Sequence, residues 1–301
     1  MKFVQLAKSL KEGLASVYLI EGEEVYFRDH AVAAVRAACG IANPMLNDVR
    51  YEGETLKGEA LGAFVRALGT LPFLDERRLV RACEFYPSEK EWDVYLKAYC
   101  ADPCPTTVLL IVNSGKKAGG AQLARKAGVT YVDCSREDEE TLSRWLFGVA
   151  RRQGLRMDAD AAQLMVRYCA RDAARMHTEV RKLAYVLGEN GSITRETVEE
   201  YIPKDVEYRI YELTQAASRR NFEQFSQILS DMLEKGSDEH AVLAALLSHL
   251  RTLCEIAVSD APDAELAALL GVKPYAVQKN RETVSRLGRA RVQALYRGLY
   301  V

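Results

Sequence analysis

Val108-Leu109-Leu110-Ile111-Val112 is an unbroken run of five aliphatic residues. A short apolar run of this kind is typical of a strand that is buried on both faces of a parallel sheet. Val17-Tyr18-Leu19-Ile20 predicts a second buried strand, and weaker strand patterns lie at residues 45–51, 78–82 and 129–132. Buried parallel strands need helices on both faces, so this set of strands decides the fold.

Helical patterns alternate with these strands, at residues 24–38, 56–68 and from Ser88 through Tyr99. Alternating strands and helices with short connections predict a three-layer α/β domain with a parallel sheet. We place this domain at residues 1–139.

The rest of the chain has no strand pattern and predicts two helical domains, at residues 140–207 and 208–301. Amphipathic helices are expected in the second of them at residues 210–217, 222–233 and 242–258.

The composition is that of a globular chain: 301 residues, 49% of them apolar and 28% charged. Lys and Arg total 41 against 42 Asp and Glu, so the chain does not bind DNA by overall charge. The longest apolar run, residues 241–247, is too short to span a bilayer, and no signal peptide precedes the first strand. We therefore expect a cytoplasmic protein with no membrane partner.

The turn after the first strand lacks the residues of a nucleotide-binding loop. A phosphate cradle needs glycines followed by Gly-Lys-Ser/Thr, whereas Gly22, Glu23 and Glu24 follow this strand. The carboxylates would repel phosphates. Gly115-Lys116 after the strand at 108–112 has no upstream glycine at the required spacing. We expect no bound nucleotide, no cofactor and no catalytic site on this chain.

Metal and hydrolase patterns are also weak. The four histidines show no H-E-x-x-H spacing, and no G-x-S-x-G elbow is present. Cys100 and Cys104 lie in a proline-containing loop, where either a structural zinc or two free thiols fit the pattern, the latter better because no second ligand pair follows. We expect no metal.

An apolar segment around Pro72 is the first candidate for binding. Leu71, Phe73 and Leu74 precede a charged turn and a strand. They either begin the core strand or form an exposed wedge that fits the pocket of a partner, where apolar anchors dominate binding. We refer to residues 70–77 as the wedge loop.

A second candidate is the segment from Glu265 to Val277, which is similar to the turn of a DNA-reading helix-turn-helix. Two packed helices with a glycine turn also fit it. From Lys273 to the C-terminus there are seven basic residues and one acid, Glu282. Among them, the candidates for DNA or helix contacts are Lys273, Lys279, Arg281, Arg286 and Arg289.

Together these stretches resemble one family, the delta subunit of the bacterial DNA polymerase III clamp loader. The similar stretches, besides the strand at 108–112, are V-Y-L-I-E-G-E-E from Val17, L-P-F-L-D-E-R-R-L-V from Leu71, W-L-F-G-V-A-R-R-Q-G from Trp145, H-T-E-V-R-K-L from His177, I-Y-E-L-T-Q-A from Ile210 and L-G-V-K-P-Y from Leu270. They cover nearly the whole chain in order.

The resemblance implies an AAA+-like α/β domain over 1–139, a three-helix lid over 140–207 and a helical, oligomerising collar over 208–301. It implies a wedge at Leu71, Phe73 and Leu74 that binds the sliding clamp (beta) and favours opening of the ring. The implied partners are the motor subunits (gamma/tau), delta-prime and, through the complex, primed DNA.

The resemblance also makes the chain a noncatalytic member of the DNA-directed DNA polymerase holoenzyme, with Gly22, Glu23 and Glu24 at a degenerate phosphate loop. Family members usually continue through a further collar helix, so the resemblance implies either a truncated sequence or a shortened collar here. The rival interpretations are a helix-turn-helix DNA-binding regulator and an active NTPase.

Overall fold

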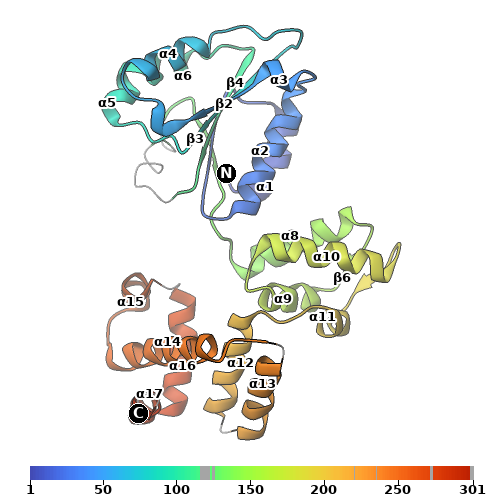
Figure 1. Ribbon diagram of the computed structural model, residues 1–301, viewed down its shortest axis with the longest axis vertical. Helices are drawn as coiled ribbons and strands as arrows, with labels where there is room; N and C mark the ends of the chain where they lie inside the picture. Colours follow the sequence, from blue (N-terminus) through green and yellow to red (C-terminus); the bar gives the residue numbers. More distant parts are fainter. Residues whose placement is uncertain (116–122, 124–125, 220, 235, 272–273, 299–301) are drawn as a thin grey trace. The chain divides into compact units, whose positions relative to one another are not determined.

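Five strands form one parallel sheet in the computed structural model, in the order β2-β3-β4-β1-β5 (Figure 1). The strands are β1 (Val17–Glu21), β2 (Asp48–Glu52), β3 (Arg78–Cys83), β4 (Thr107–Asn113) and β5 (Thr130–Asp133). β4 and β1 lie inside the sheet and are buried over almost their whole length, which explains their continuous apolar sequence.

The structure describes residues 1–115, 123, 126–219, 221–234, 236–271 and 274–298. Within them, the chain divides into two compact units. The first comprises residues 1–166 and 171–198, and the second comprises residues 167–170 and 199–301. The domain boundaries expected at 139/140 and 207/208 remain a prediction.

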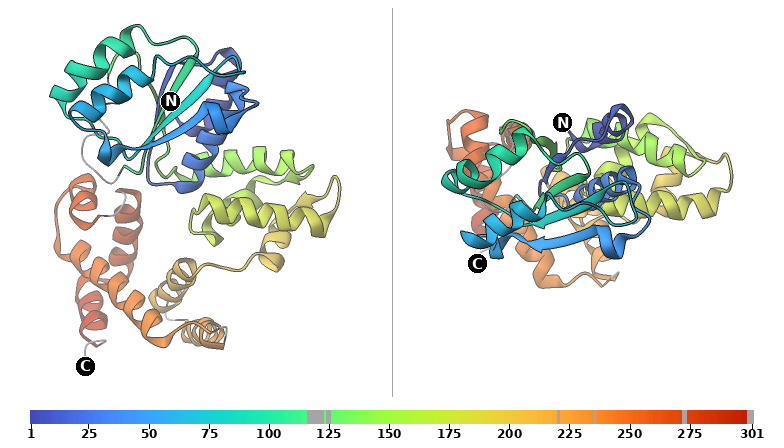
Figure 2. Two further views of the ribbon diagram at one scale, coloured as in Figure 1. Left: turned by 45° about the horizontal axis from the view of Figure 1, so that its top comes forward. Right: turned by 90° about the horizontal axis from the view of Figure 1, so that it is seen from above.

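Helices cover both faces of the sheet (Figure 2). α1 (Phe3–Glu12) and α2 (Val25–Cys39) lie on one face. The other face carries α4 (Glu59–Ala67) and a segment made of α5 (Glu89–Glu91), the π-helical turn η2 (Trp92–Leu96) and α6 (Lys97–Ala101). A core cluster joins Leu19 and Leu109 of the sheet to Phe64, Trp92 and Leu96 of this second layer. The expected three-layer α/β domain is confirmed.

The strand expected at residues 45–51 begins later than predicted. Residues 44–47 form a helical turn, α3 (Pro44–Asn47), and the strand starts at Asp48; a 3-10 turn, η1 (Gly53–Thr55), follows it. Pro44 at the first helical position favours this turn, because its missing N–H is not needed there.

The segment after the sheet contains α8 (Glu139–Arg152), α9 (Ala159–Tyr168), α10 (Ala173–Leu187) and the short α11 (Arg195–Tyr201). The expectation of no strand here is wrong, because β6 (Arg156–Met157) and β7 (Ser192–Ile193) pair in parallel. The segment therefore holds a small sheet and four helices, where the resemblance implies three helices and the sequence itself predicts the short fourth one at residues 194–201. Trp145 of α8 packs on Tyr26 and Phe27 of α2, with ring centroids 5.6 and 5.7 Å apart.

The second unit is helical in its described part. Its helices are α12 (Val206–Ser218), α13 (Phe222–Glu234), α14 (Glu239–Val258), α15 (Asp263–Leu270), α16 (Pro274–Leu287) and α17 (Arg289–Gly298). Two cores hold them: one around Leu213 and Met232, the other around Leu253, Val277 and Val292. The predicted amphipathic helices are confirmed.

α14 has the length and composition of a membrane span, although its longest uninterrupted apolar run is short. The sequence prediction considered only the uninterrupted run 241–247, which is one part of this helix. Its ion pair between Arg251 and Glu255 and its core residues Leu253 and Ile256 are also typical of a helix in a globular bundle. One such helix does not indicate a membrane location.

Candidate functional site

The wedge loop lies at the amino end of β3 and carries three large apolar side chains on the surface. Leu71, Phe73 and Leu74 are 73%, 61% and 77% exposed. The core of the strand begins only after them, at Leu79. The interpretation in which these residues begin the core strand is therefore wrong, because the charged turn 75–77 separates them from it.

Leu74 is held in a left-handed backbone conformation, with φ of 59°. This conformation is unfavourable for a residue with a Cβ and persists only where the surroundings impose it. At Leu74 it occurs on one of the most exposed large apolar side chains of the domain. Such strain is more typical of a functional loop than of an ordinary surface turn.

Asn47, at the end of α3, fixes the backbone of the wedge loop. Its Oδ1 accepts the Phe73 N–H at 2.8 Å and its Nδ2 donates to the Phe73 carbonyl at 2.7 Å. The side chain is almost fully buried, at 1% exposure, so these bonds form away from water. A buried amide with both ends satisfied holds its partner in a single geometry.

Asp75 completes this network. Its carboxylate accepts the backbone N–H groups of Ala42 and Asn43, both at 3.0 Å, and the Asn47 amide at 2.6 Å. Burial alone would raise the pKa of Asp75, but these donors outweigh it and lower the pKa. The carboxylate is therefore charged at neutral pH and joins the wedge loop to the turn before α3.

Arg78 holds the other side of the loop. Its guanidinium is largely buried and donates to the carbonyls of Ala67 and Thr70, both at 3.2 Å. The loop is thus fixed at Thr70, Phe73 and Asp75, while the apolar side chains between these points face solvent.

The carboxyl end of β1 holds the predicted degenerate phosphate loop, and its backbone groups bond within the protein. The Gly22 N–H donates to the Asn113 carbonyl at 3.4 Å, and the Glu24 N–H donates to the Cys134 carbonyl at 3.0 Å. A Cβ on Gly22 would overlap the backbone of Cys134 and Ser135. The chain after β5 therefore packs directly against this turn. It fills the space that a phosphate would need in a nucleotide-binding loop.

Carboxylates also surround this turn. Glu24 caps α2 by accepting the Tyr26 N–H at 3.4 Å, and burial followed by the Asp172 carboxylate raises the pKa of Glu24. Burial, Asp133 and Glu84 likewise raise the pKa of Glu21. A phosphate would meet like charge here. Glu23 is exposed, and Lys116 lies outside the described residues.

The predicted basic contacts that the structure describes do not gather at one site. Arg281 donates to Asp263 at 2.7 Å and to the carbonyls of Ser259 and Ala261, so it is a structural residue of the second unit. Arg289 pairs with Asp260 on the surface, and Arg286 is exposed. Lys273 lies outside the described residues, as does the side chain of Lys279 on α16.

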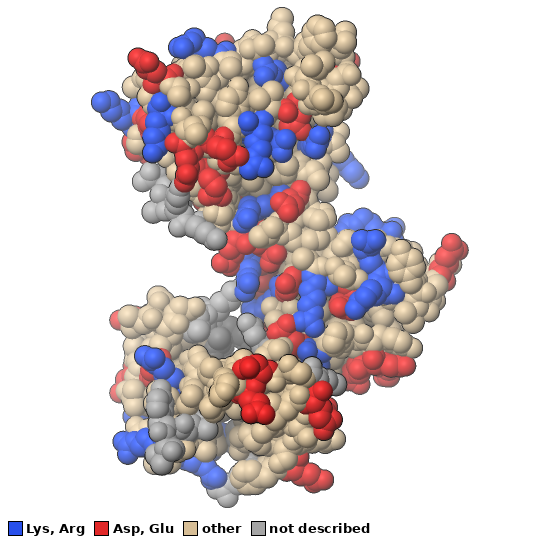
Figure 3. Space-filling view, in the orientation of Figure 1, with Lys and Arg blue, Asp and Glu red and all other residues tan. Residues whose placement is uncertain are grey.

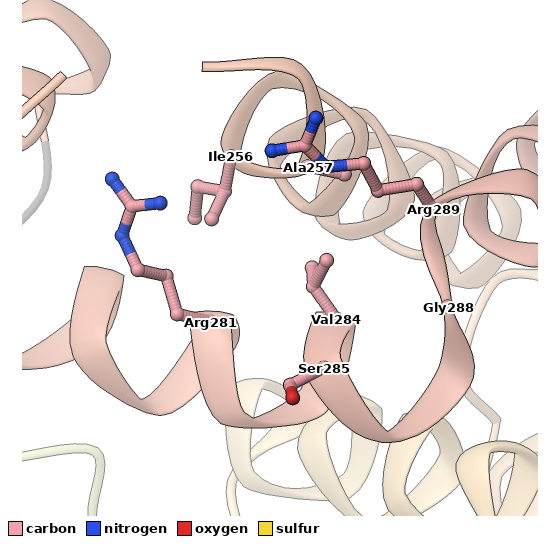
Figure 4. A pocket seen from close by; sticks show the side chains of 7 residues that line it. All are labelled: Ile256, Ala257, Arg281, Val284, Ser285, Gly288 and Arg289. Atoms are coloured by element: carbon pink, nitrogen blue, oxygen red, sulfur yellow. The ribbon is translucent and has the colours of Figure 1, made fainter. Parts of the chain in front are cut away.

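The helix-turn-helix interpretation is not favoured either. Gly271 ends α15 in a left-handed conformation, and Leu266, Ala267 and Val277 are buried in one core, as in two ordinary packed helices. A hollow beside this core is lined by Ile256, Ala257, Arg281, Val284, Ser285, Gly288 and Arg289 (Figure 4). Its Arg281 is already bound to protein oxygens, so the hollow offers little to a ligand.

The seven cysteines are free thiols, and the described residues contain no cluster of three or more metal-binding side chains. Burial raises the pKa of Cys100 to about 11, so this thiol is protonated at neutral pH. Among the described residues, no third metal-binding side chain joins Cys100 and Cys104, and the two free thiols expected there stay a prediction.

Sequence reasoning did not identify Asn47, Asp75 and Arg78 as the residues that hold the wedge loop. Asn43-Pro44 is a turn signal that could have moved the strand start to Asp48. No local pattern could pair Asn47 with Phe73, because they are 26 residues apart.

Comparisons with known proteins agree with this architecture. Residues 207–300 match a family model described as the DNA polymerase III delta subunit, C-terminal domain. The DNA polymerase III subunit delta of Bacillus subtilis (strain 168) is 22% identical over 286 residues, covering 90% of this chain and 82% of the relative. The solved Bacillus subtilis DNA clamp loader delta protein has a TM-score of 0.74 at 19% identity, covering 99% of this chain and 92% of its own.

The structural likeness shows the fold, which is a parallel α/β domain followed by helical segments. The family match covers the C-terminal helices, and the sequence relative extends along most of the chain. These findings agree with one another, and they make the chain similar to the DNA polymerase III delta subunit, by the family model over residues 207–300 and by the sequence relative over most of its length.

Proposed function

We propose that this clamp-loader subunit binds the sliding clamp (beta) through Leu71, Phe73 and Leu74 and favours the open state of the ring. The observation that carries the proposal is the exposure of these three side chains, 61% to 77%, on a loop whose backbone is fixed by Asn47, Asp75 and Arg78. An exposed apolar group on a preorganised loop is suited to a hydrophobic pocket.

Ring opening follows if the wedge loop binds the open clamp more tightly than the closed one. A ligand shifts an equilibrium only by its differential affinity for the two states. Burying each large apolar side chain contributes about 1.5–3 kcal/mol. If the receiving pocket is complete only in the open clamp, three such side chains supply enough free energy to shift the population strongly.

The energy source lies in the partner subunits. The turn at Gly22 bonds within the protein and is surrounded by carboxylates, which supports a subunit without nucleotide, cofactor or catalytic site. ATP would act in the motor subunits (gamma/tau), which assemble with this chain and delta-prime in the cytoplasm. Primed DNA would be reached through the complex.

Residues 208–301 would form the collar through which the subunits assemble. α14 supports this role, because it is strongly apolar yet mostly not buried, and it leaves side chains such as Leu243, which is 41% exposed, open to a neighbouring helix. Arg286 and Arg289 are exposed on the same unit and available to a collar partner or to DNA.

The wedge is tested by the affinity of the full chain for the sliding clamp of the same organism. Replacing Leu71 and Phe73 by alanine removes two anchors, so we expect a loss of about 3 kcal/mol or roughly a hundredfold in Kd. The matched control is Val94→Ala, which truncates another exposed apolar side chain, 61% exposed, on η2.

Two results would contradict the proposal. One is an unchanged Kd for the Leu71→Ala, Phe73→Ala double variant. The other is an equal loss in the Val94→Ala control, because the clamp would then be binding exposed apolar side chains in general. Circular dichroism and the melting temperature show whether each variant is folded.

A further inference from the structure

A second apolar element lies beside the wedge loop. Met45 and Leu46 of α3 are 98% and 54% exposed. A methionine side chain on the surface offers a flexible, polarisable contact that adapts to a partner. Over α3 and the neighbouring loop, Figure 3 shows a broad area without Lys, Arg, Asp or Glu.

The sheet places α3 next to the wedge loop. α3 runs directly into β2, and the wedge loop runs directly into β3. β2 and β3 are parallel neighbours, with Asp48 opposite Leu79. Two segments that enter neighbouring parallel strands lie at the same edge of the sheet, about 5 Å apart where the strands begin.

Hydrogen bonds join the two segments at this edge. Asn47 of α3 bonds to both backbone groups of Phe73, and the Asp75 carboxylate bonds to Ala42, Asn43 and Asn47. α3 therefore cannot move independently of the wedge loop, and the apolar side chains of both segments are presented together.

The area available to a partner also favours a larger surface than the wedge alone. A stable interface buries about 800 Å² on each partner. Even at about 250 Å² each, the upper value for an aromatic side chain, three side chains supply less than this area. Met45 and Leu46 are the exposed apolar side chains of the adjoining α3. They enlarge the apolar surface beside the wedge loop.

We propose that α3 is the second half of the clamp-binding surface, with Met45 and Leu46 in contact with the clamp, and that Asn47 and Asp75 are positioning residues that hold α3 and the wedge loop in one arrangement. This inference rests on the proposed function, since its partner is the same sliding clamp.

The contact is tested with the full chain and the sliding clamp, by comparing Met45→Ser with Phe73→Ala. We expect Met45→Ser to weaken binding about fivefold to tenfold and Phe73→Ala to weaken it more. The control is Val25→Ser, because Val25 is 55% exposed and begins α2 at the opposite edge of the sheet. Its Kd should equal that of the wild type.

The outcomes separate this inference from the function beneath it. If Phe73→Ala weakens binding and Met45→Ser does not, the α3 contact is overturned while the wedge stands. If neither variant weakens binding, both are overturned. A loss with Val25→Ser equal to that with Met45→Ser also overturns the α3 contact.

The positioning role is tested by amide hydrogen exchange at Phe73, whose N–H donates to Asn47. In Asp75→Ala we expect exchange at Phe73 to accelerate at least tenfold and clamp association to slow about fivefold, with Asp75→Asn closer to the wild type. A variant that only lowers the melting temperature, with Phe73 protection and association unchanged, would overturn the positioning role. Asn47→Ala serves as a second variant where it folds.

Discussion

The two edges of the parallel sheet both contain loops that are fixed by hydrogen bonds, but they differ in which groups remain exposed to a partner. We call the carboxyl edge closed and the amino edge open. At the carboxyl edge, the N–H groups of Gly22 and Glu24 bond to carbonyls of neighbouring segments, and Arg28 donates to the Gly22 carbonyl. At the amino edge, Asn47 and Asp75 bond to the backbone of the wedge loop and its neighbour, while Phe73 and Leu74 stay exposed.

The difference shows that the two edges of one parallel sheet use their backbone groups in different ways. In open α/β sheets, ligands usually bind at the carboxyl edge, where helix N-termini can hold anions. Here Glu24 caps the N-terminus of α2 with its own carboxylate. At this edge, backbone N–H groups that could bind a ligand bond within the protein instead. At the amino edge, backbone hydrogen bonds fix the wedge loop so that its apolar side chains face solvent.

The largest expected effect comes from adding a side-chain carbon at Gly22, on the closed carboxyl edge. In Gly22→Ala, the new Cβ would overlap the backbone of Cys134 and Ser135, at a position where φ is 153°. We expect a loss of roughly 3 kcal/mol or more in the free energy of unfolding, because backbone must move to make room. Urea unfolding of the full chain measures it.

Gly13→Ala is the matched control, since nothing lies within 4 Å of the added Cβ. It should change the free energy of unfolding by less than about 0.5 kcal/mol. A Gly22→Ala protein as stable as this control would mean that the turn is not closed, and the contrast between the edges would fail.

The next largest effect is a loss of clamp affinity without a loss of stability, at Leu74 on the open edge. Leu74→Gly removes an exposed apolar side chain from a left-handed residue, which glycine adopts without steric strain. We expect clamp affinity to fall by about 1.5–3 kcal/mol, roughly tenfold to a hundredfold. The melting temperature should stay close to that of the wild type, since relief of strain offsets the greater freedom of the unfolded chain.

A parallel fall in melting temperature and affinity would instead make Leu74 a structural residue. Leu46→Gly is not a suitable control, because Leu46 is itself part of the proposed clamp-binding surface, so Val94→Ala is used again. Its affinity should remain that of the wild type.

Much of the fold could be predicted from the sequence because the signals are local. The buried strands Val17–Glu21 and Thr107–Asn113 appear in the sequence as apolar runs, and the amphipathic period of residues 242–258 predicts α14. The small pair β6 and β7 was missed, because two residues in each strand give no periodic pattern.

The site was predictable only in part. The apolar residues around Pro72 stand out in the sequence, but whether they are buried or exposed depends on Asp75 and Asn47, which bond across 28 positions of the chain. The closure at Gly22 likewise depends on the chain after β5, which contacts it only in the folded state. A local sequence pattern cannot identify these contacts, because the residues that make them are far apart along the chain.

The smallest expected effect is a dependence of wedge-loop stability on pH. Because its hydrogen bonds lower the pKa of Asp75 below the ordinary 3.8, the unfolded chain binds this proton more readily than the folded one. The stabilisation is therefore complete above the ordinary pKa and is lost as pH falls through the folded value. The difference in melting temperature between wild type and Asp75→Asn should be constant above about pH 5 and shrink toward pH 3. Because other carboxylates titrate in both proteins, this difference isolates Asp75, and a difference that persisted undiminished at pH 3 would show that its charge does not hold the open edge in place.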